Sequence, residues 1–160
     1  MYRKETKGKV YAFWILATEA VGALSGFLTR EGTQYYSANV KKPPLSPPAV
    51  VFPIVWAILY ALMGTGAARV TLSENPELRK RCLRIYLLQL GFNFCWSLIF
   101  FNLRAYSIAF FWLAALWGLI VWMILSFLEA DRTAGLLQIP YALWVLFAGY
   151  LNLGVWLLNR

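Results

Sequence analysis

Residues 41–70 read KKPPLSPPAVVFPIVWAILYALMGTGAARV, and this stretch decides how the chain folds. Its first thirteen residues include two lysines and five prolines, and an almost unbroken apolar run follows. Proline cannot donate a backbone hydrogen bond and disfavours helix in the residue before it, so the chain should stay extended until about residue 50. The run that follows has the roughly 20 residues that a helix needs to cross a bilayer core of about 30 Å. We therefore expect a stiff proline segment that leads into a membrane-spanning helix, with Pro53 tolerated in its first turn.

The composition of the chain is that of an integral membrane protein. Of its 160 residues, 61% are apolar and only 14% are charged, and the mean hydropathy is +0.59. A water-soluble domain carries about a quarter charged residues, so this chain has too little polar surface to cover itself in water. We predict an all-α integral membrane protein in which residues 1–160 form one domain, a bundle of five transmembrane helices. The predicted spans are residues 10–28, 50–70, 82–103, 106–128 and 134–158.

The net charge of +8 is explained by topology and does not require a nucleic-acid partner. Basic residues beside membrane spans collect on the cytoplasmic side, whereas nucleic-acid-binding proteins carry a basic stripe on a folded surface. With five crossings, one side of the membrane holds ten of the fifteen basic residues, namely Arg3, Lys4, Lys7, Lys9, Arg69, Arg79, Lys80, Arg81, Arg84 and Arg132. The other side holds Arg30, Lys41, Lys42, Arg104 and Arg160. This bias predicts a cytoplasmic N-terminus.

The chain contains no histidine, which excludes a Ser-His-Asp triad, a His-metal catalytic site and a His-ligated haem. We expect no metal site. Six of the seven carboxylates fall in predicted loops or tails, so paired acid–base chemistry is not expected either. Glu19 is the exception, because it lies within the first predicted span. An intramembrane carboxylate is a candidate functional group, for example in an ion-coupled transporter, and the alternative is a carboxyl that hydrogen-bonds a neighbouring helix.

The connection between the first two predicted spans, residues 29–49, is longer than two neighbouring helices need. Long irregular segments in compact domains are usually lids, binding loops or disordered chain. The aromatic pair Tyr35 and Tyr36, together with the prolines, argues against disorder. We expect a long first loop that closes a ligand cavity, with a passive connector as the alternative.

Three of the predicted spans carry aromatic and amide side chains on one face, at spacings of three and four residues. The three stripes are Phe52, Trp56, Tyr60 and Met63; Tyr86, Gln89, Asn93 and Trp96; and Gln138, Tyr141, Trp144, Ala148 and Asn152. Amides in hydrocarbon are costly unless they are paired, so these faces should point into the bundle. They can serve as hydrogen-bonding contacts between helices or as the lining of a small-molecule cavity, and both interpretations stay open.

Three motifs that follow one another in the chain resemble the translocator protein family, also called tryptophan-rich sensory proteins or peripheral-type benzodiazepine receptors. They are YYSANVKKPPLSPPAVVFPIVWAILYALMG at residues 35–64, QLGFNFCWSLIFF at 89–101 and IPYALWVLFAGYLN at 139–152. The chain looks like a bacterial member. It departs from many members by having Tyr35 and Leu45 in place of tryptophan. The sterol-binding pattern of animal members also fails, because the first basic residue after Tyr150 is Arg160.

The resemblance implies a homodimer in the bacterial cell membrane, in which the first loop closes a cavity for tetrapyrroles such as protoporphyrin IX and for related hydrophobic small molecules. No cofactor is required. The implied function is sensing, transport or turnover of the pigment, and alternatives are a scaffold subunit or an enzyme of light- and oxygen-dependent porphyrin breakdown. In that last case the catalytic residues would be Trp56 and Trp144, which match tryptophans linked to this breakdown in bacterial members.

The ligand-binding residues implied by the resemblance, with Phe52 added from the aromatic stripe, are Tyr36, Pro47, Phe52, Trp56, Asn93, Phe94, Trp96, Tyr141, Trp144 and Ala148. Their aromatic rings suit the flat face of a porphyrin, because aromatic pairs gain about 0.5–1.5 kcal/mol beyond the burial of their area. Arg30, Lys41 and Lys42 lie on the side of the predicted lid, where they suit the carboxylates of such a ligand.

Overall fold

The structure is a computed structural model that describes residues 4–160, so Arg3, which entered the predicted charge bias, lies outside the described residues. Within this range the chain forms helices and no strand. The helices are α1 (Lys4–Leu28), α2 (Arg30–Asn39), α3 (Val51–Thr71), α4 (Pro76–Ser97), which continues as the π-helical turn η1 (Leu98–Asn102), α5 (Tyr106–Ala130), α6 (Arg132–Leu136) and α7 (Ile139–Leu158). Five helical stretches are long and apolar enough to span a membrane, which confirms the predicted fold class.

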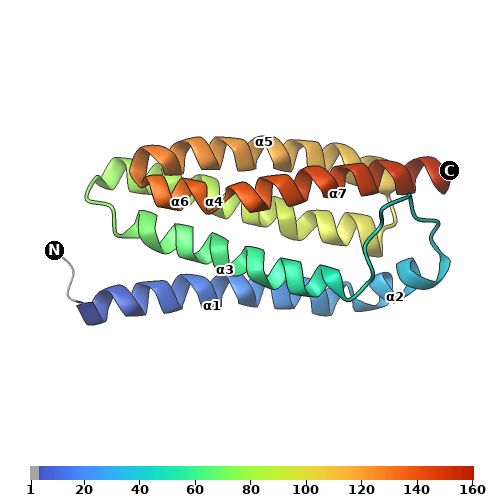
Figure 1. The fold of residues 1–160 in the computed structure, drawn as a ribbon, viewed down its shortest axis with the longest axis horizontal. Coiled ribbons are helices and arrows are strands. Elements are labelled where there is room, and N and C mark those ends of the chain that lie inside the picture. The colour runs from blue at the N-terminus through green and yellow to red at the C-terminus, as the bar shows by residue number, and fades with distance from the viewer. Residues whose placement is uncertain (1–3) are drawn as a thin grey trace.

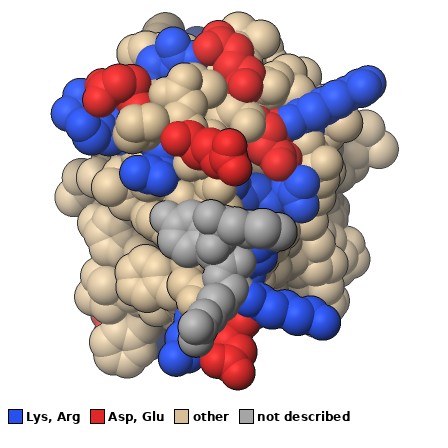
Figure 2. All heavy atoms as spheres, turned by 90° about the vertical axis from the view of Figure 1, so that its left-hand side faces the viewer, with Lys and Arg blue, Asp and Glu red and all other residues tan. Residues whose placement is uncertain are grey.

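The long helices run side by side along the long axis of the molecule (Figure 1). Helix α1 packs mainly against α3 at one edge of the bundle, and α5 packs against α4 and α7 at the other. Helix α2 and the proline segment (residues 40–50) lie at one end, which we call the lid end. The α3–α4 connection and the start of α1 lie at the opposite end, where acidic and basic side chains intermingle (Figure 2).

Two of the spanning helices begin earlier than their hydropathy predicted. Helix α4 starts at Pro76, six residues before the predicted bound at 82, and α1 starts at Lys4. The Asn75 side chain fixes the start of α4, because its Oδ1 accepts hydrogen bonds of 3.1 Å from the backbone N–H groups of Glu77 and Leu78. The first turns of both helices carry charged residues, which lower the local hydropathy. An apolar stretch in the sequence therefore marks the part of a helix inside the hydrocarbon and does not include the charged helix end.

The predicted long first loop is not confirmed, because half of it is helix. Residues 30–39 form α2, separated from α1 only by Thr29, and only residues 40–50 are irregular. Threonine hydroxyls stabilise the junction, since Thr29 donates to the Ser25 carbonyl at 2.8 Å and Thr33 donates to the Thr29 carbonyl at 2.9 Å. The sequence of α2 is short and polar, so no apolar run signals a helix there, but it also contains no proline to prevent one.

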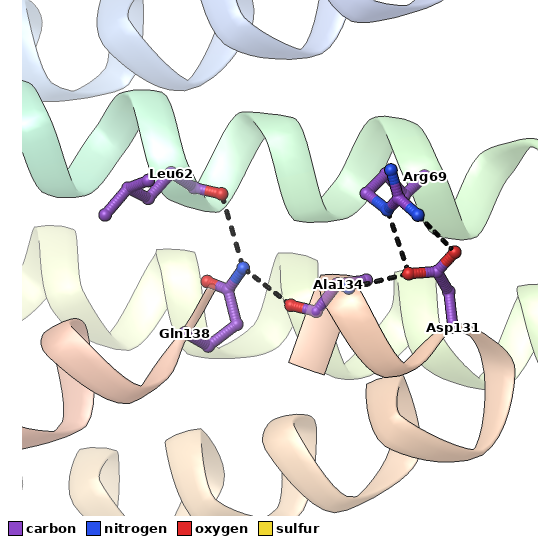
Figure 3. Close-up of polar contacts among 5 residues, drawn as sticks. All are labelled: Leu62, Arg69, Asp131, Ala134 and Gln138. Carbon is purple, nitrogen blue, oxygen red and sulfur yellow. Dashed lines mark hydrogen bonds and ion pairs between the residues drawn. The ribbon is translucent and has the colours of Figure 1, made fainter. Parts of the chain in front are cut away.

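The fifth predicted span is divided into α6 and α7 by a turn at Leu137 and Gln138. Asp131 caps α6 by accepting a 2.7 Å hydrogen bond from the Ala134 N–H. The same carboxylate accepts two hydrogen bonds from Arg69 of α3, from Nε at 2.8 Å and from Nη2 at 2.9 Å (Figure 3). Gln138 then bridges to α3 by donating to the Leu62 carbonyl at 3.3 Å. These contacts fix where α7 enters the bundle.

The pairing of Asp131 with Arg69 can be separated from its capping role, because asparagine caps a helix as well as aspartate does. We expect Asp131→Asn to lower the free energy of unfolding by about 1 kcal/mol or less, as for other partly exposed ion pairs. Asp131→Ala should cost about 1 kcal/mol more, because the cap is lost as well. Thermal unfolding of the detergent-solubilised protein measures both changes.

The effect should depend on pH. The hydrogen bonds from Arg69 lower the pKa of Asp131, so its contribution is complete above the ordinary aspartate pKa of about 3.9 and is lost as the pH falls through the lower folded-state value. The matched control is Glu129→Gln, which removes a more exposed pair with Arg81. An Asp131→Asn protein that is as stable as the unaltered chain at neutral pH would contradict this role.

Candidate functional site

A cavity of about 640 Å³ lies inside the lid end of the bundle. Its walls come from the second half of α1, from α2, from the start of α3, from the end of α4 with η1, and from α7. The proline segment contributes Ser46 and Pro47 to the rim. Small-molecule sites commonly have volumes of about 300–1,000 Å³, so the space is sufficient for a ligand of drug or pigment size.

Aromatic side chains form two sides of the cavity. Trp56 of α3 and Trp144 of α7 both line it, and Phe52 packs edge-to-face on Trp144 with ring centroids 5.9 Å apart. Trp96 and Phe100 line the side formed by α4 and η1, where their rings stack at 5.2 Å. These contacts hold the rings in place, so the aromatic walls exist before any ligand enters.

The wall formed by α1 consists mostly of small residues, which lets this helix approach α3 closely. A Cβ atom on Gly22 would lie 2.3 Å from a ring carbon of Tyr60, and one on Gly64 would lie 2.6 Å from the Cα of Ile15. Gly26, one turn beyond Gly22, faces open space in the cavity. Glu19 also lines the cavity, so the intramembrane carboxylate belongs to this site.

A buried hydrogen-bond network lies beneath the cavity and joins α3, α4 and α7. Tyr60 Oη donates to Asn93 Oδ1 at 2.9 Å, and Asn93 Nδ2 donates to Tyr141 Oη at 3.0 Å. Tyr141 Oη in turn donates to Gln89 Oε1 at 2.7 Å. We call these four residues the core network. Tyr141 and Gln89 are completely buried, and Tyr60 is the one member that also lines the cavity.

The lid consists of α2 and the proline segment, and two sets of contacts hold it down. On one side, Asn102 Nδ2 of η1 donates to the Leu28 carbonyl at 3.0 Å, where α1 meets α2. On the other side, the backbone of Lys41 makes two hydrogen bonds with the Asn159 side chain, of 3.0 Å and 2.8 Å. Pro43 packs so closely on α7 that a Cβ on Gly154 would lie 2.5 Å from it.

The lid places two cations at the mouth of the cavity. Arg30 and Lys42 both line it, and the Arg30 guanidinium lies 4.3 Å from the ring centroid of Phe27. Lys42 Nζ donates to the carbonyls of Ser37 at 3.1 Å and Val40 at 3.2 Å, at the end of α2. Lys41 does not line the cavity. Its backbone hydrogen-bonds the side chain of Asn159, the residue that follows α7.

Tyr36 covers the cavity from α2, with its ring 5.5 Å from the ring of Phe100 and 4.9 Å from Lys42 Nζ. Burial raises the pKa of the Tyr36 hydroxyl, and the neighbouring Tyr106 raises it further. The hydroxyl is therefore neutral near pH 7 and can donate a hydrogen bond to a ligand.

Seven of the ten predicted ligand-binding residues line the cavity: Tyr36, Pro47, Phe52, Trp56, Trp96, Trp144 and Ala148. Asn93 and Tyr141 lie below it in the core network. Phe94 does not line the cavity. Successive residues on a helix are turned by about 100°, so the Phe94 side chain points away from the face of α4 that carries Asn93 and Trp96. Within residues 4–160, no three His, Cys, Asp or Glu side chains come together to hold a metal ion.

The sequence did not reveal the lid anchors, and it signalled the small-residue wall of α1 only weakly. Asn159 and Lys41 are 118 positions apart, so no local pattern could have paired them. Gly22 and Gly26 form a GxxxG pattern, which is a recognisable but weak signal for close helix approach.

The sequence profile of the TspO/MBR family matches residues 14–157, which include every element of the cavity. The protein CrtK of Rhodobacter capsulatus is 36% identical over 151 residues, which cover 94% of this chain and 92% of CrtK. The tryptophan-rich protein TspO of Chlorobaculum tepidum is 34% identical, with 88% and 89% covered. The human translocator protein is 33% identical, with 82% and 79% covered. The family match over most of the chain and these identities show that the chain, with its five spanning helices, belongs to the TspO/MBR family of membrane proteins.

Proposed function

We propose that this protein binds a metal-free porphyrin such as protoporphyrin IX in the cavity under the lid, so that the pigment is sensed, transported or turned over. The observation that carries the proposal is the pairing of flat aromatic walls with cations at the mouth of one cavity inside a membrane bundle. A porphyrin combines a flat apolar ring with two carboxylates at one edge, and each part has a counterpart here.

The ring would lie against the indoles of Trp56 and Trp144, which line the cavity from α3 and α7. Each aromatic contact of this kind contributes about 0.5–1.5 kcal/mol beyond area burial. Trp56 is supported from below by Tyr60, with ring centroids 5.5 Å apart, and Trp144 is supported by Phe52. A site with such preformed walls loses little side-chain entropy when a rigid ligand enters.

The carboxylates would lie at the mouth, within reach of Arg30 and Lys42. Hydrogen bonds between a cation and a carboxylate are about twice as strong as neutral ones. An axial ligand is not required for a porphyrin without a metal, so the absence of histidine is compatible with this function.

A second candidate function is breakdown of the bound pigment in light and oxygen. The observation that favours it is that both candidate tryptophans, Trp56 and Trp144, line the same cavity and would touch the ring. Indole is readily oxidised, so these two side chains are the groups through which the protein would take part in such a reaction.

We further propose a homodimer in the bacterial cell membrane with a cytoplasmic N-terminus. Of the described basic residues, nine belong to the end of the bundle that faces the viewer in Figure 2 and five belong to the lid end. Such a bias of basic residues sets the orientation of a protein in the membrane, with the more basic side in the cytoplasm. The mouth of the cavity would then open towards the outer face of the membrane. The homodimer rests on the family resemblance.

Titration of the purified protein with protoporphyrin IX, followed by porphyrin fluorescence, tests the binding proposal. We expect saturable binding that Trp56→Leu weakens about five- to tenfold, because one stacking contact of about 1 kcal/mol and part of the buried area are lost. Trp122→Leu is the matched control, since Trp122 lies on the outside of α5. Non-saturable binding, or equal affinities of Trp56→Leu and the unaltered protein, would rule the proposal out.

The same samples separate binding from breakdown when they are illuminated in air. If the second function holds, the unaltered protein bleaches the bound porphyrin faster than the free pigment, and Trp144→Phe slows the bleaching while it keeps the binding. If the porphyrin bleaches at the same rate in all samples, the protein binds the pigment without breaking it down, and the enzymatic function is ruled out.

The anchors of the lid should control how fast a ligand leaves. Asn159→Ala removes both hydrogen bonds to the Lys41 backbone, so we expect dissociation of protoporphyrin IX to accelerate about fivefold, the equivalent of one net hydrogen bond of about 1 kcal/mol. Stopped-flow competition measures this rate. Asn39→Ala is the control, because the Asn39 amide donates to the Tyr35 carbonyl within α2. An unchanged rate in Asn159→Ala would show that the Asn159 anchor does not control ligand release.

A further inference from the structure

A second hollow of about 660 Å³ lies at the end of the bundle opposite the lid, between the start of α4 and the end of α5. Apolar side chains, among them Leu78 and Ile85, meet charged ones there, and Trp122 of α5 forms one side. Trp122 is 53% exposed, so its indole faces the surroundings of the bundle. None of the functions discussed above uses this hollow.

The hollow lies at the boundary between hydrocarbon and headgroups. The stretch Pro76–Asn102 has 27 residues and is about 40 Å long, which exceeds the core of about 30 Å, so part of it must emerge from the hydrocarbon. Arg81 pairs with Glu129 across α4 and α5, which marks a level where charges are solvated. Arg84 lies three residues further along α4, about 4.5 Å deeper. Tryptophan is enriched at this depth of a membrane, as Trp122 is here.

Arg84 is the cation of the hollow without an acidic partner. The other two basic side chains are paired, Arg81 with Glu129 and Lys80 with Glu77 at 3.1 Å. Among residues 4–160, no carboxylate lies within 4.0 Å of the Arg84 guanidinium, and the side chain is exposed. A cationic side chain at this depth of the membrane costs free energy unless an anion pairs with it. The planar guanidinium matches a phosphate through two parallel hydrogen bonds.

An apolar surface continues from the hollow towards the middle of the membrane. Two contacts define the antiparallel register of α4 and α5: Cys82 Sγ donates to the Ser126 carbonyl, and Trp112 Nε1 donates to the Phe92 carbonyl. This register places Leu88 of α4 beside Gly118 of α5 on the outer face. Gly118 has nothing within 4 Å of a Cβ position, so the seam between the helices is open there.

We propose that the hollow binds one anionic phospholipid. Its phosphate pairs with Arg84, its glycerol region packs on Trp122, and one acyl chain follows the open seam past Gly118. The charge of the hollow selects the headgroup, because Lys80, Arg81 and Arg84 outnumber Glu77 and Glu129 and disfavour an additional choline cation. Basic pockets beside transmembrane helices recognise anionic headgroups in this way.

Native mass spectrometry tests the site on the full chain released from vesicles that contain equal amounts of phosphatidylglycerol and phosphatidylcholine. We expect the protein to retain phosphatidylglycerol preferentially. Arg84→Gln should lower that retention about fivefold, the equivalent of about 1 kcal/mol for one basic residue at a membrane surface, and Arg84→Lys should lower it less. Gly118→Leu should also lower it by filling the seam. Lys7→Gln is the control, because Lys7 is exposed on α1 away from the hollow.

Four results would overturn the proposal. The first is undiminished retention by Arg84→Gln, and the second is equal retention of the two lipids by the unaltered protein. The third is displacement of the lipid by inorganic phosphate with no effect of Gly118→Leu, which would indicate a site for free phosphate. The fourth is efficient cross-linking in the vesicles between copies that carry Leu88→Cys, which would show that a second copy covers the seam. Circular dichroism confirms that each variant is folded, and Gly118→Leu tests the site independently should Arg84→Gln fail to fold.

Discussion

The core network of Tyr60, Gln89, Asn93 and Tyr141 is the constraint on which the rest of the structure depends. Polar groups inside a bilayer must find partners within the protein, since no water is present to satisfy them. Each of these side chains meets its partner on another helix, so a change in the register of α3, α4 or α7 would leave members of the network unpaired. That register brings Trp56, Trp96 and Trp144 to the same cavity directly above the network.

The two halves of the cavity wall are built differently. The side formed by α3, α4 and α7 contains the network and most of the buried residues. In the apolar part of α1, by contrast, only 11% of the residues are buried. On the α1 side, close helix approach at Gly22 and Gly64 replaces side-chain interlocking, and the lid is tied by a few hydrogen bonds. Segments with few buried contacts open at the lowest free-energy cost, so we expect this side of the cavity, between α1, the lid and α3, to open most readily.

The sequence predicted the features that leave a periodic trace. Five apolar runs defined the spans, and stripes spaced by three and four residues identified the faces of α3, α4 and α7 that point inwards. The stripes contain both kinds of residue, because Gln89 and Asn93 join helices while Trp96 lines the cavity. Contacts between distant residues leave no such trace, which is why the Asn159 anchor was missed. A short polar helix such as α2 has no apolar run to signal it. The step of about 100° per residue along α4 turns Phe94 away from the face that carries Trp96, so Phe94 does not line the cavity.

A structure of the protein in lipid nanodiscs with protoporphyrin IX bound would show directly whether the core network holds a preformed porphyrin cavity beneath the lid. We expect the ring between Trp56 and Trp144 and its carboxylates beside Arg30 and Lys42. The hydrogen bonds of the core network should be unchanged. A porphyrin bound on the outer face of the helices, or one that breaks the Asn93–Tyr141 hydrogen bond to enter, would contradict it.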